Sequence, residues 1–73
     1  MATFSERLKE LRTSRELTQK LLAEKIGISR RGLQCYELET HKPTSDVVIN
    51  LANYFGVSTD YLLGLSNNPK RLE

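Results

Sequence analysis

Cysteine, histidine, tryptophan and glycine-rich loops are scarce or absent in this chain of 73 residues. It has one cysteine, Cys35, one histidine, His41, and no tryptophan. A single cysteine cannot build a disulfide framework, and a single histidine lacks the partners that a metal site or a catalytic pair needs. Since the chain also has no phosphate-binding glycine loop and no room for a substrate pocket, we expect no enzyme, metal, cofactor or small-molecule ligand.

No apolar stretch approaches the roughly 20 residues that a membrane-spanning helix needs. The first residues lack the basic flank and apolar core of a secretory signal, so we expect a cytoplasmic protein without a membrane partner. The composition, 38% hydrophobic and 27% charged, is that of an ordinary globular chain. Its length allows one domain, which we place at residues 1–65, followed by a polar tail or linker at residues 66–73 that contains turn formers.

Charge is unevenly distributed along the chain, although the formal net charge is only +2. Residues 1–31 carry eight basic and four acidic side chains, whereas residues 32–73 carry three and five. A polyanion would bind the basic half. Charged helix faces are more often simply solvated, so charge alone leaves both interpretations open.

Helix-capping residues recur along the chain and divide it into five predicted helices. Thr3 and Glu6 have the spacing of a capping box, and this first helix should run to about Ser14. The other predicted N-caps are Thr18, Ser29, Thr44 and Ser58, and glycines that end helices stand at positions 27, 56 and 64. No β-strand pattern of useful length accompanies them, so the predicted fold is all-α.

The stretch from Gln19 to Leu38 meets the requirements of a helix-turn-helix. Such a unit holds two helices at a steep angle through a short turn, so it needs a small residue at the crossing and a flexible one in the turn. Ala23 and Gly27 stand at these positions. The apolar contacts of the two helices would come from Leu22, Ile26, Ile28, Leu33 and Tyr36.

Several ordered segments resemble the phage repressor and Cro family of DNA-binding domains, also called the XRE family. The matching segments are residues 17–19 (LTQ), 22–29 (LAEKIGIS), 36–37 (YE), 42–44 (KPT), 51–52 (LA) and 55–58 (FGVS). The resemblance implies a compact five-helix bundle of the lambda-repressor-like type. It also implies a sequence-specific regulator of transcription bound to double-stranded operator DNA, most simply a homodimeric repressor that reads an inverted repeat.

The resemblance assigns base reading to the third predicted helix, which in this family enters the major groove. Arg30, Arg31, Gln34 and Cys35 fall on the reading positions. An arginine fork can donate two hydrogen bonds to guanine O6 and N7, so Arg31, and after it Arg30, are the first expected base contacts. Gln34 would pair with adenine or bind a phosphate, and Cys35 would touch a thymine methyl group or nothing.

Phosphate contacts are implied at four further positions. Gln19 matches a family glutamine that begins the second helix and binds a backbone phosphate, and Thr18, Lys42 and Thr40 are further candidates. Contacts of this kind fix the register of a protein on DNA without reading its sequence.

Two other implications of the resemblance concern protein contacts. Arg12 and Glu37 match family positions that form a partly buried ion pair, so removing Arg12 should destabilise the fold. The family's dimer surface often involves the last helix and its flanks. In this chain the last helix and its flanks contain Val57, Tyr61, Leu62 and Leu65, which are the implied dimer contacts.

Three residues depart from the family pattern. Gly32 lies inside the third predicted helix, where glycine costs about 1 kcal/mol relative to alanine. Glu39 stands where the family commonly has glycine or asparagine, and Leu21 is apolar where an exposed polar residue is expected. The loop of residues 40–42 is also less basic than usual, so we expect a modest affinity for phosphates.

A protein-binding adapter, such as an antitoxin of the same fold, is the alternative function. Such an adapter would need an extension that binds its partner. The eight residues after Leu65 are few and polar for that purpose.

Overall fold

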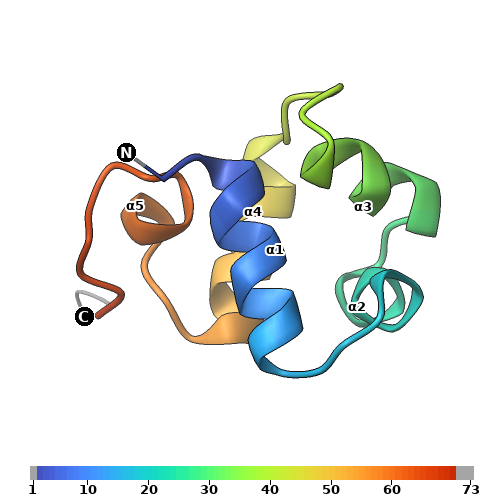
Figure 1. Ribbon diagram of the computed structural model, residues 1–73, viewed down its shortest axis with the longest axis horizontal. Helices are drawn as coiled ribbons and strands as arrows, with labels where there is room; N and C mark the ends of the chain where they lie inside the picture. Colours follow the sequence, from blue (N-terminus) through green and yellow to red (C-terminus); the bar gives the residue numbers. More distant parts are fainter. Residues whose placement is uncertain (1, 71–73) are drawn as a thin grey trace.

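The computed structural model describes residues 2–70, which form five α-helices around one core (Figure 1). The helices are α1 (Phe4–Ser14), α2 (Gln19–Ile26), α3 (Arg30–Glu37), α4 (Ser45–Phe55) and α5 (Thr59–Leu62). No strand occurs within residues 2–70. The predicted all-α fold with five helices is therefore confirmed.

Each helix begins at a hydroxyl group that accepts a hydrogen bond from the backbone N–H three residues later. The five predicted N-caps, Thr3, Thr18, Ser29, Thr44 and Ser58, all make this bond, at 3.0–3.3 Å. At α1 the Thr3 N–H also donates to Glu6 Oε1 at 3.0 Å, which completes the predicted capping box. This backbone bond, with the Thr3 hydroxyl, lowers the pKa of the Glu6 carboxyl. The Glu6 carboxylate therefore contributes to the stability of α1 at pH values above its ordinary pKa, and this contribution is lost as the pH falls through the lowered pKa.

Left-handed backbone conformations end all five helices or follow them closely, and Gly64, with a φ of 80°, has this role after α5. Gly27 after α2 and Gly56 after α4 have φ values of 79° and 70°, as predicted for helix-ending glycines. Glu16 and Glu39, with φ values of 56° and 62°, adopt the same region after α1 and α3. A side chain with a Cβ is strained there. At position 39, glycine or asparagine would therefore adopt this conformation at a lower free-energy cost than the glutamate that is present.

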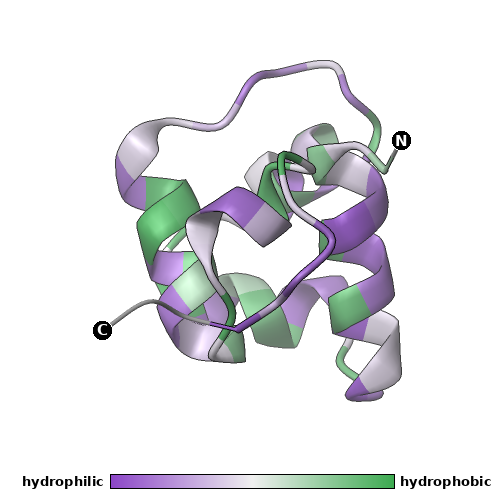
Figure 2. Ribbon diagram, turned by 90° about the vertical axis from the view of Figure 1, so that its left-hand side faces the viewer, coloured by the Kyte–Doolittle hydropathy of each residue, from purple (hydrophilic) through white to green (hydrophobic). Residues whose placement is uncertain are grey.

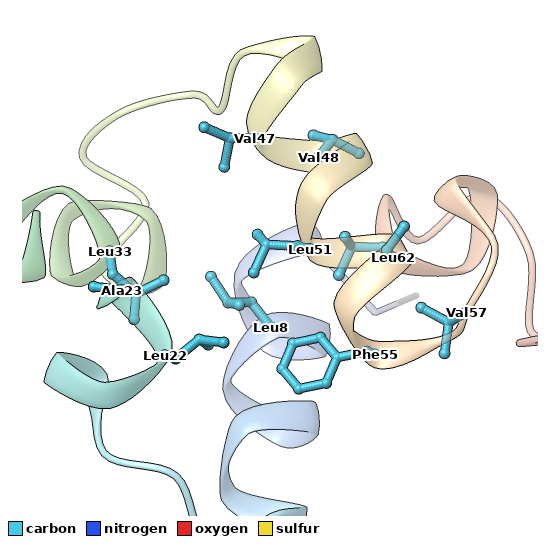
Figure 3. Packing of buried hydrophobic residues seen from close by; sticks show 11 residues of the cluster. Leu8, Leu22, Ala23, Leu33, Val47, Val48, Leu51, Phe55, Val57 and Leu62 are labelled. Carbon is cyan, nitrogen blue, oxygen red and sulfur yellow. The ribbon is translucent and has the colours of Figure 1, made fainter. Parts of the chain in front are cut away.

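One fully buried leucine from each helix forms the centre of the core. These residues are Leu8, Leu22, Leu33, Leu51 and Leu62, and each has an exposed fraction of 0%. Figure 3 shows their side chains pointing toward the middle of the bundle, with valines and Phe55 of α4 beside them. Because every helix contributes to the same cluster, the position of α3 depends on all the others.

Two residues of the predicted dimer surface belong to this core instead. Val57 is 7% exposed and Leu62 is not exposed at all. The prediction that they contact a partner is wrong, because both side chains close the core where α4 leads into α5. Tyr61 is half-buried, with the Arg7 guanidinium 3.8 Å from the centre of its ring, and Leu65 is 70% exposed.

The segment after α5 lies back on the bundle. Asn67 accepts a hydrogen bond from Arg7 Nη2 at 3.0 Å, and the Pro69 carbonyl accepts one from the Ser58 N–H at 2.9 Å. Figure 2, viewed from the α5 side, shows the largely hydrophilic C-terminal segment crossing the helices. The boundary after residue 65 stays a prediction, and residues 71–73 of the predicted tail lie outside the described part of the chain.

Candidate nucleic-acid interface

Helices α2 and α3 are joined by a turn of three residues, 27–29, and form a helix-turn-helix. The N–H groups of Gly27 and Ile28 both donate to the Ala23 carbonyl, at 2.9 and 3.0 Å, which closes the end of α2. Ser29 then caps α3. Ala23 is 1% exposed, in keeping with the small residue expected where the two helices cross. The turn is hydrogen-bonded at both ends, so α3 is held firmly relative to α2.

Helix α3 has a buried face and an exposed face. Leu33 and Glu37, which stand four residues apart, are buried. Arg30, Arg31 and Gln34 are exposed. These three polar side chains therefore point away from the core and are accessible to a ligand.

A shallow hollow of about 290 Å³ lies beside α3 and reaches the loop before α4. The lining residues are Ser29, Arg31, Gly32, Cys35, Tyr36, His41 and Lys42. It brings together three of the predicted DNA contacts, Arg31, Cys35 and Lys42, so that two cationic side chains border a half-buried thiol. Helical spacing predicts the neighbours of Cys35 within α3, but it does not place a loop residue such as His41 beside them.

The glycine within α3 lines this hollow at its capped end. The Gly32 N–H donates to the Ser29 hydroxyl at 3.0 Å. A Cβ at position 32 would come within 3.1 Å of the same hydroxyl oxygen, which is closer than side chains normally approach. Glycine therefore leaves room for the cap, which offsets part of its low helix propensity.

The predicted ion pair between Arg12 and Glu37 is confirmed. Arg12 Nε lies 2.6 Å from Glu37 Oε2, and Arg12 Nη2 donates to Oε1 at 3.1 Å, so the pair is bidentate. Arg12 Nη1 also donates to the Leu17 carbonyl at 2.8 Å. The side chain of Glu37 is only 2% exposed and that of Arg12 is 16% exposed. This network ties α1 and the loop after it to the end of α3.

Gln19, the first residue of α2, is attached to the same network. Its Nε2 donates to Glu37 Oε1 at 3.1 Å. A carboxamide nitrogen has two N–H groups, so one remains for an outside acceptor such as a phosphate oxygen. The neighbouring hydroxyl of Thr18 accepts from the Leu21 N–H and still carries its own O–H donor. Leu21 is 40% exposed, so this unusual apolar residue does lie at the surface.

Thr40 has a different role in the structure. Its N–H and its hydroxyl both donate to the Cys35 carbonyl, at 3.1 and 3.2 Å, and close the end of α3. The hydroxyl also lies 3.4 Å from His41 Nδ1. In this conformation both donors of Thr40 are used within the protein, which argues against it as a phosphate contact. Lys42, two residues later, is exposed.

Residues 2–70 contain neither a metal-binding cluster nor a membrane-spanning helix. No group of three or more histidine, cysteine, aspartate or glutamate side chains in that range is placed to hold a metal ion. None of the helices there is both long enough and apolar enough to cross a membrane.

The fold and the exposed face of α3 define a helix-turn-helix domain of the phage-repressor type. Residues 5–67 match the family described as "Helix-turn-helix domain". Because the match covers most of the chain, the protein belongs to this family. The resemblance to the XRE-type domains is thereby confirmed.

Proteins of similar sequence are named as transcriptional regulators. The uncharacterized HTH-type transcriptional regulator YobD of Bacillus subtilis (strain 168) is 44% identical over 66 residues, which are 90% of this chain and 59% of YobD. The HTH-type transcriptional regulator ImmR of the same strain is 41% identical over 71 residues, 97% of this chain and 56% of ImmR. The chain therefore spans somewhat more than half the length of these two relatives.

Solved structures show the same arrangement of helices. The P22 c2 repressor, in complex with a synthetic operator, aligns with a TM-score of 0.83 at 23% identity, over 90% of this chain and 100% of that one. A transcriptional regulator from Listeria innocua aligns with a TM-score of 0.82 at 28% identity, over 97% of this chain and 64% of that one. The lambda-repressor-like fold is thus confirmed.

Proposed function

We propose that this chain is a sequence-specific regulator of transcription that binds double-stranded operator DNA and represses as a homodimer. The observation that carries the proposal is the division of α3, with Arg30, Arg31 and Gln34 exposed on one side while Leu33 and Glu37 fix the other in the core. The names of the relatives, which are those of regulators and not of enzymes, support it. A regulator of this kind would act in the cytoplasm, where its DNA is.

In the proposed complex α3 enters the major groove and reads base edges. Arg31 makes the principal contact, a bidentate pair with guanine, because its planar fork matches O6 and N7. Arg30 and Gln34 supply the second and third polar contacts. Cys35, which lines the hollow next to Arg31, contacts a thymine methyl group.

Phosphate contacts flank the reading helix in this proposal. Gln19 and Thr18, at the start of α2, donate their remaining hydrogen bonds to phosphate oxygens. Lys42, in the loop before α4, contributes its ammonium group. Thr40 would have to release the Cys35 carbonyl before it could donate to a phosphate, so we leave it out. Two α3 helices of a dimer would read half-sites about 34–36 Å apart along one face of the duplex.

Selection of binding sites from random duplex DNA tests the proposal. We expect a short inverted repeat, bound about a thousandfold or more tighter than scrambled DNA. Its affinity should fall linearly on a plot of log affinity against log salt concentration, as expected for released counterions. Selection without a consensus, together with weak binding that depends only on salt, would refute the proposal and favour the protein-binding adapter.

Variants of Arg31 then separate base reading from general attraction to DNA. Arg31→Ala should cost about 1–3 kcal/mol and relax the preference at one base position, with little change in the salt slope, because the lost contact is to a base and not to a phosphate. Arg31→Lys keeps the charge but loses the fork, so it should relax the preference while leaving the slope nearly unchanged. Lys9→Ala, at an exposed position of α1, is the control and should change neither. An unchanged base preference in Arg31→Ala would remove Arg31 from the reading residues.

A further inference from the structure

The loop between α3 and α4 carries the only histidine of the chain, His41. Its side chain is exposed and lines the hollow beside α3 together with Arg31 and Lys42. A neighbouring hollow of about 240 Å³, which reaches Phe4 at the start of α1, is also lined by His41 and Lys42. His41 therefore lies at the edge of the candidate nucleic-acid interface, beside two side chains that we expect to bind DNA.

The hydrogen bonds of Thr40 determine which ring nitrogen of His41 carries a proton. The Thr40 hydroxyl donates to the Cys35 carbonyl at 3.2 Å, and its Oγ1 lies 3.4 Å from His41 Nδ1. A hydroxyl has one proton to donate, so toward the ring this oxygen acts as an acceptor, and Nδ1 must carry the hydrogen. In the neutral ring the other nitrogen, Nε2, is consequently an unprotonated acceptor. A neutral His41 thus has no donor left for a phosphate oxygen.

We infer that His41 is a further phosphate-binding residue of this interface and binds only in its protonated form, an inference that rests on the proposed function. Protonation of Nε2 supplies both an N–H donor and a positive charge, and phosphate oxygens accept charge-assisted hydrogen bonds of this kind. The neutral ring would instead bring a lone pair toward the phosphate oxygens. The charge of a histidine side chain ordinarily changes between about pH 5 and 8, so DNA binding responds to pH in this range.

Three charged side chains border His41, namely Arg31 of α3 and Glu39 and Lys42 of the segment that follows it. The two cations disfavour a third positive charge in the free chain, and the carboxylate favours it. Two further titratable groups, the Cys35 thiol and the Tyr36 phenol, line the hollow from α3, and the residues that α1 contributes are uncharged. A DNA phosphate adds negative charge beside the ring, so the binding of DNA and the binding of a proton reinforce each other.

DNA affinity should rise as the pH falls, because the protonated chain binds more tightly than the neutral one. At fixed salt concentration we expect a gain of about threefold to tenfold per bound chain between about pH 8 and about pH 5.5, as for one additional charged contact. The slope of log affinity against log salt concentration should also become steeper by about 0.9 per chain, since one more phosphate is neutralised.

Binding of the selected inverted repeat by the wild-type chain, His41→Gln and His41→Lys tests the inference. The glutamine variant is always neutral, so at every pH it should bind as weakly as the wild-type chain does near pH 8. The lysine variant is always charged, so it should lose the pH dependence and keep the steeper salt slope. Lys9→Ala, at an exposed position of α1, is the control and should keep the pH dependence of the wild type.

Nuclear magnetic resonance follows the His41 ring directly, since the chain has no other histidine. In the free chain the neutral ring should carry its proton on Nδ1. Added DNA should keep the ring protonated to a higher pH than in the free chain. A ring whose titration is unchanged by DNA, or a pH dependence that persists in His41→Gln, would overturn the inference while leaving base reading intact.

The scrambled duplex separates this inference from the proposed function, because a phosphate contact needs no particular sequence. A chain that selects no consensus, but whose binding to scrambled DNA loses its pH dependence in His41→Gln, refutes sequence-specific regulation and supports the histidine contact. Sequence selection without a pH dependence that requires His41 has the opposite meaning. Failure to bind any duplex refutes both.

Discussion

Replacing Arg12 by alanine tests how strongly the buried ion pair holds α3 in place. The change removes both hydrogen bonds that Arg12 donates to the Glu37 carboxylate. The Glu37 side chain is only 2% exposed, and its carboxylate keeps the hydrogen bond from Gln19. Breaking one side of a buried pair costs about 3–5 kcal/mol. At about 0.05–0.15 kcal/mol per residue, a chain of this length has only about 4–11 kcal/mol of stability in total. Arg12→Ala should therefore remove a large share of it.

Thermal and urea unfolding followed by circular dichroism measure this loss. For a domain of this size each kcal/mol shifts the melting temperature by about 4–8 °C, so we expect a decrease of at least about 12 °C. Lys9→Ala, on the exposed side of the same helix, is the control and should stay within about 0.5 kcal/mol of the wild type.

A double variant distinguishes the unpaired charge from lost packing. Arg12→Met combined with Glu37→Leu removes both charges and keeps most of the volume, and such replacements of buried pairs are often neutral. We expect the double variant to be more stable than Arg12→Ala. The reasoning is refuted if Arg12→Ala unfolds like the wild type, or if the double variant is no more stable than the single one.

Two further predictions concern backbone conformation. Glu39→Gly should stabilise the domain by roughly 0.5–1 kcal/mol, because relief of about 1–2 kcal/mol of left-handed strain exceeds the entropic cost of glycine, whereas Glu24→Gly inside α2 should cost about 1 kcal/mol. Urea unfolding measures both, and a loss at position 39 would contradict the argument. Gly27→Ala should cost about 1–2 kcal/mol, because Gly27 has a positive φ. Gly64→Ala should be more destabilising, because Gly64 also has a positive φ and a Cβ there would in addition collide with the Ala2 carbonyl. Equal losses in the two melting curves would speak against the close contact.

The helix boundaries could be predicted because their causes are local. A threonine or serine hydroxyl caps the N–H three residues later, and a glycine ends a helix by adopting a positive φ, whatever the rest of the chain does. The inward face of α3 could be predicted for the same reason, from Leu33 and Tyr36 at a spacing of three, and these side chains are buried and half-buried respectively. The pairing of Arg12 with Glu37, by contrast, came from the family resemblance and not from any local rule.

The contacts between distant segments could not be predicted. Nothing in the spacing of residues 29–35 places His41 and Lys42 beside Cys35, because the loop before α4 has no periodic pattern. The burial of Val57 and Leu62 was missed for a related reason. An apolar residue near the end of a short chain can cover the core or bind a partner, and only the packing of α5 against α1 and α4 decides between them.

Helix α3, the proposed reading helix, depends on the rest of the domain for its structure. Helix α3 has eight residues and a glycine inside it, and a peptide of that length is not stably helical in water. Its shape is imposed by the Ser29 cap, the burial of Leu33 and the hydrogen bonds to Glu37. Variants of the supporting residues should therefore lower stability without changing which bases are preferred, whereas variants of Arg31 should change base preference without lowering stability. Measuring both properties for the same set of variants separates the residues that hold α3 from those that read DNA.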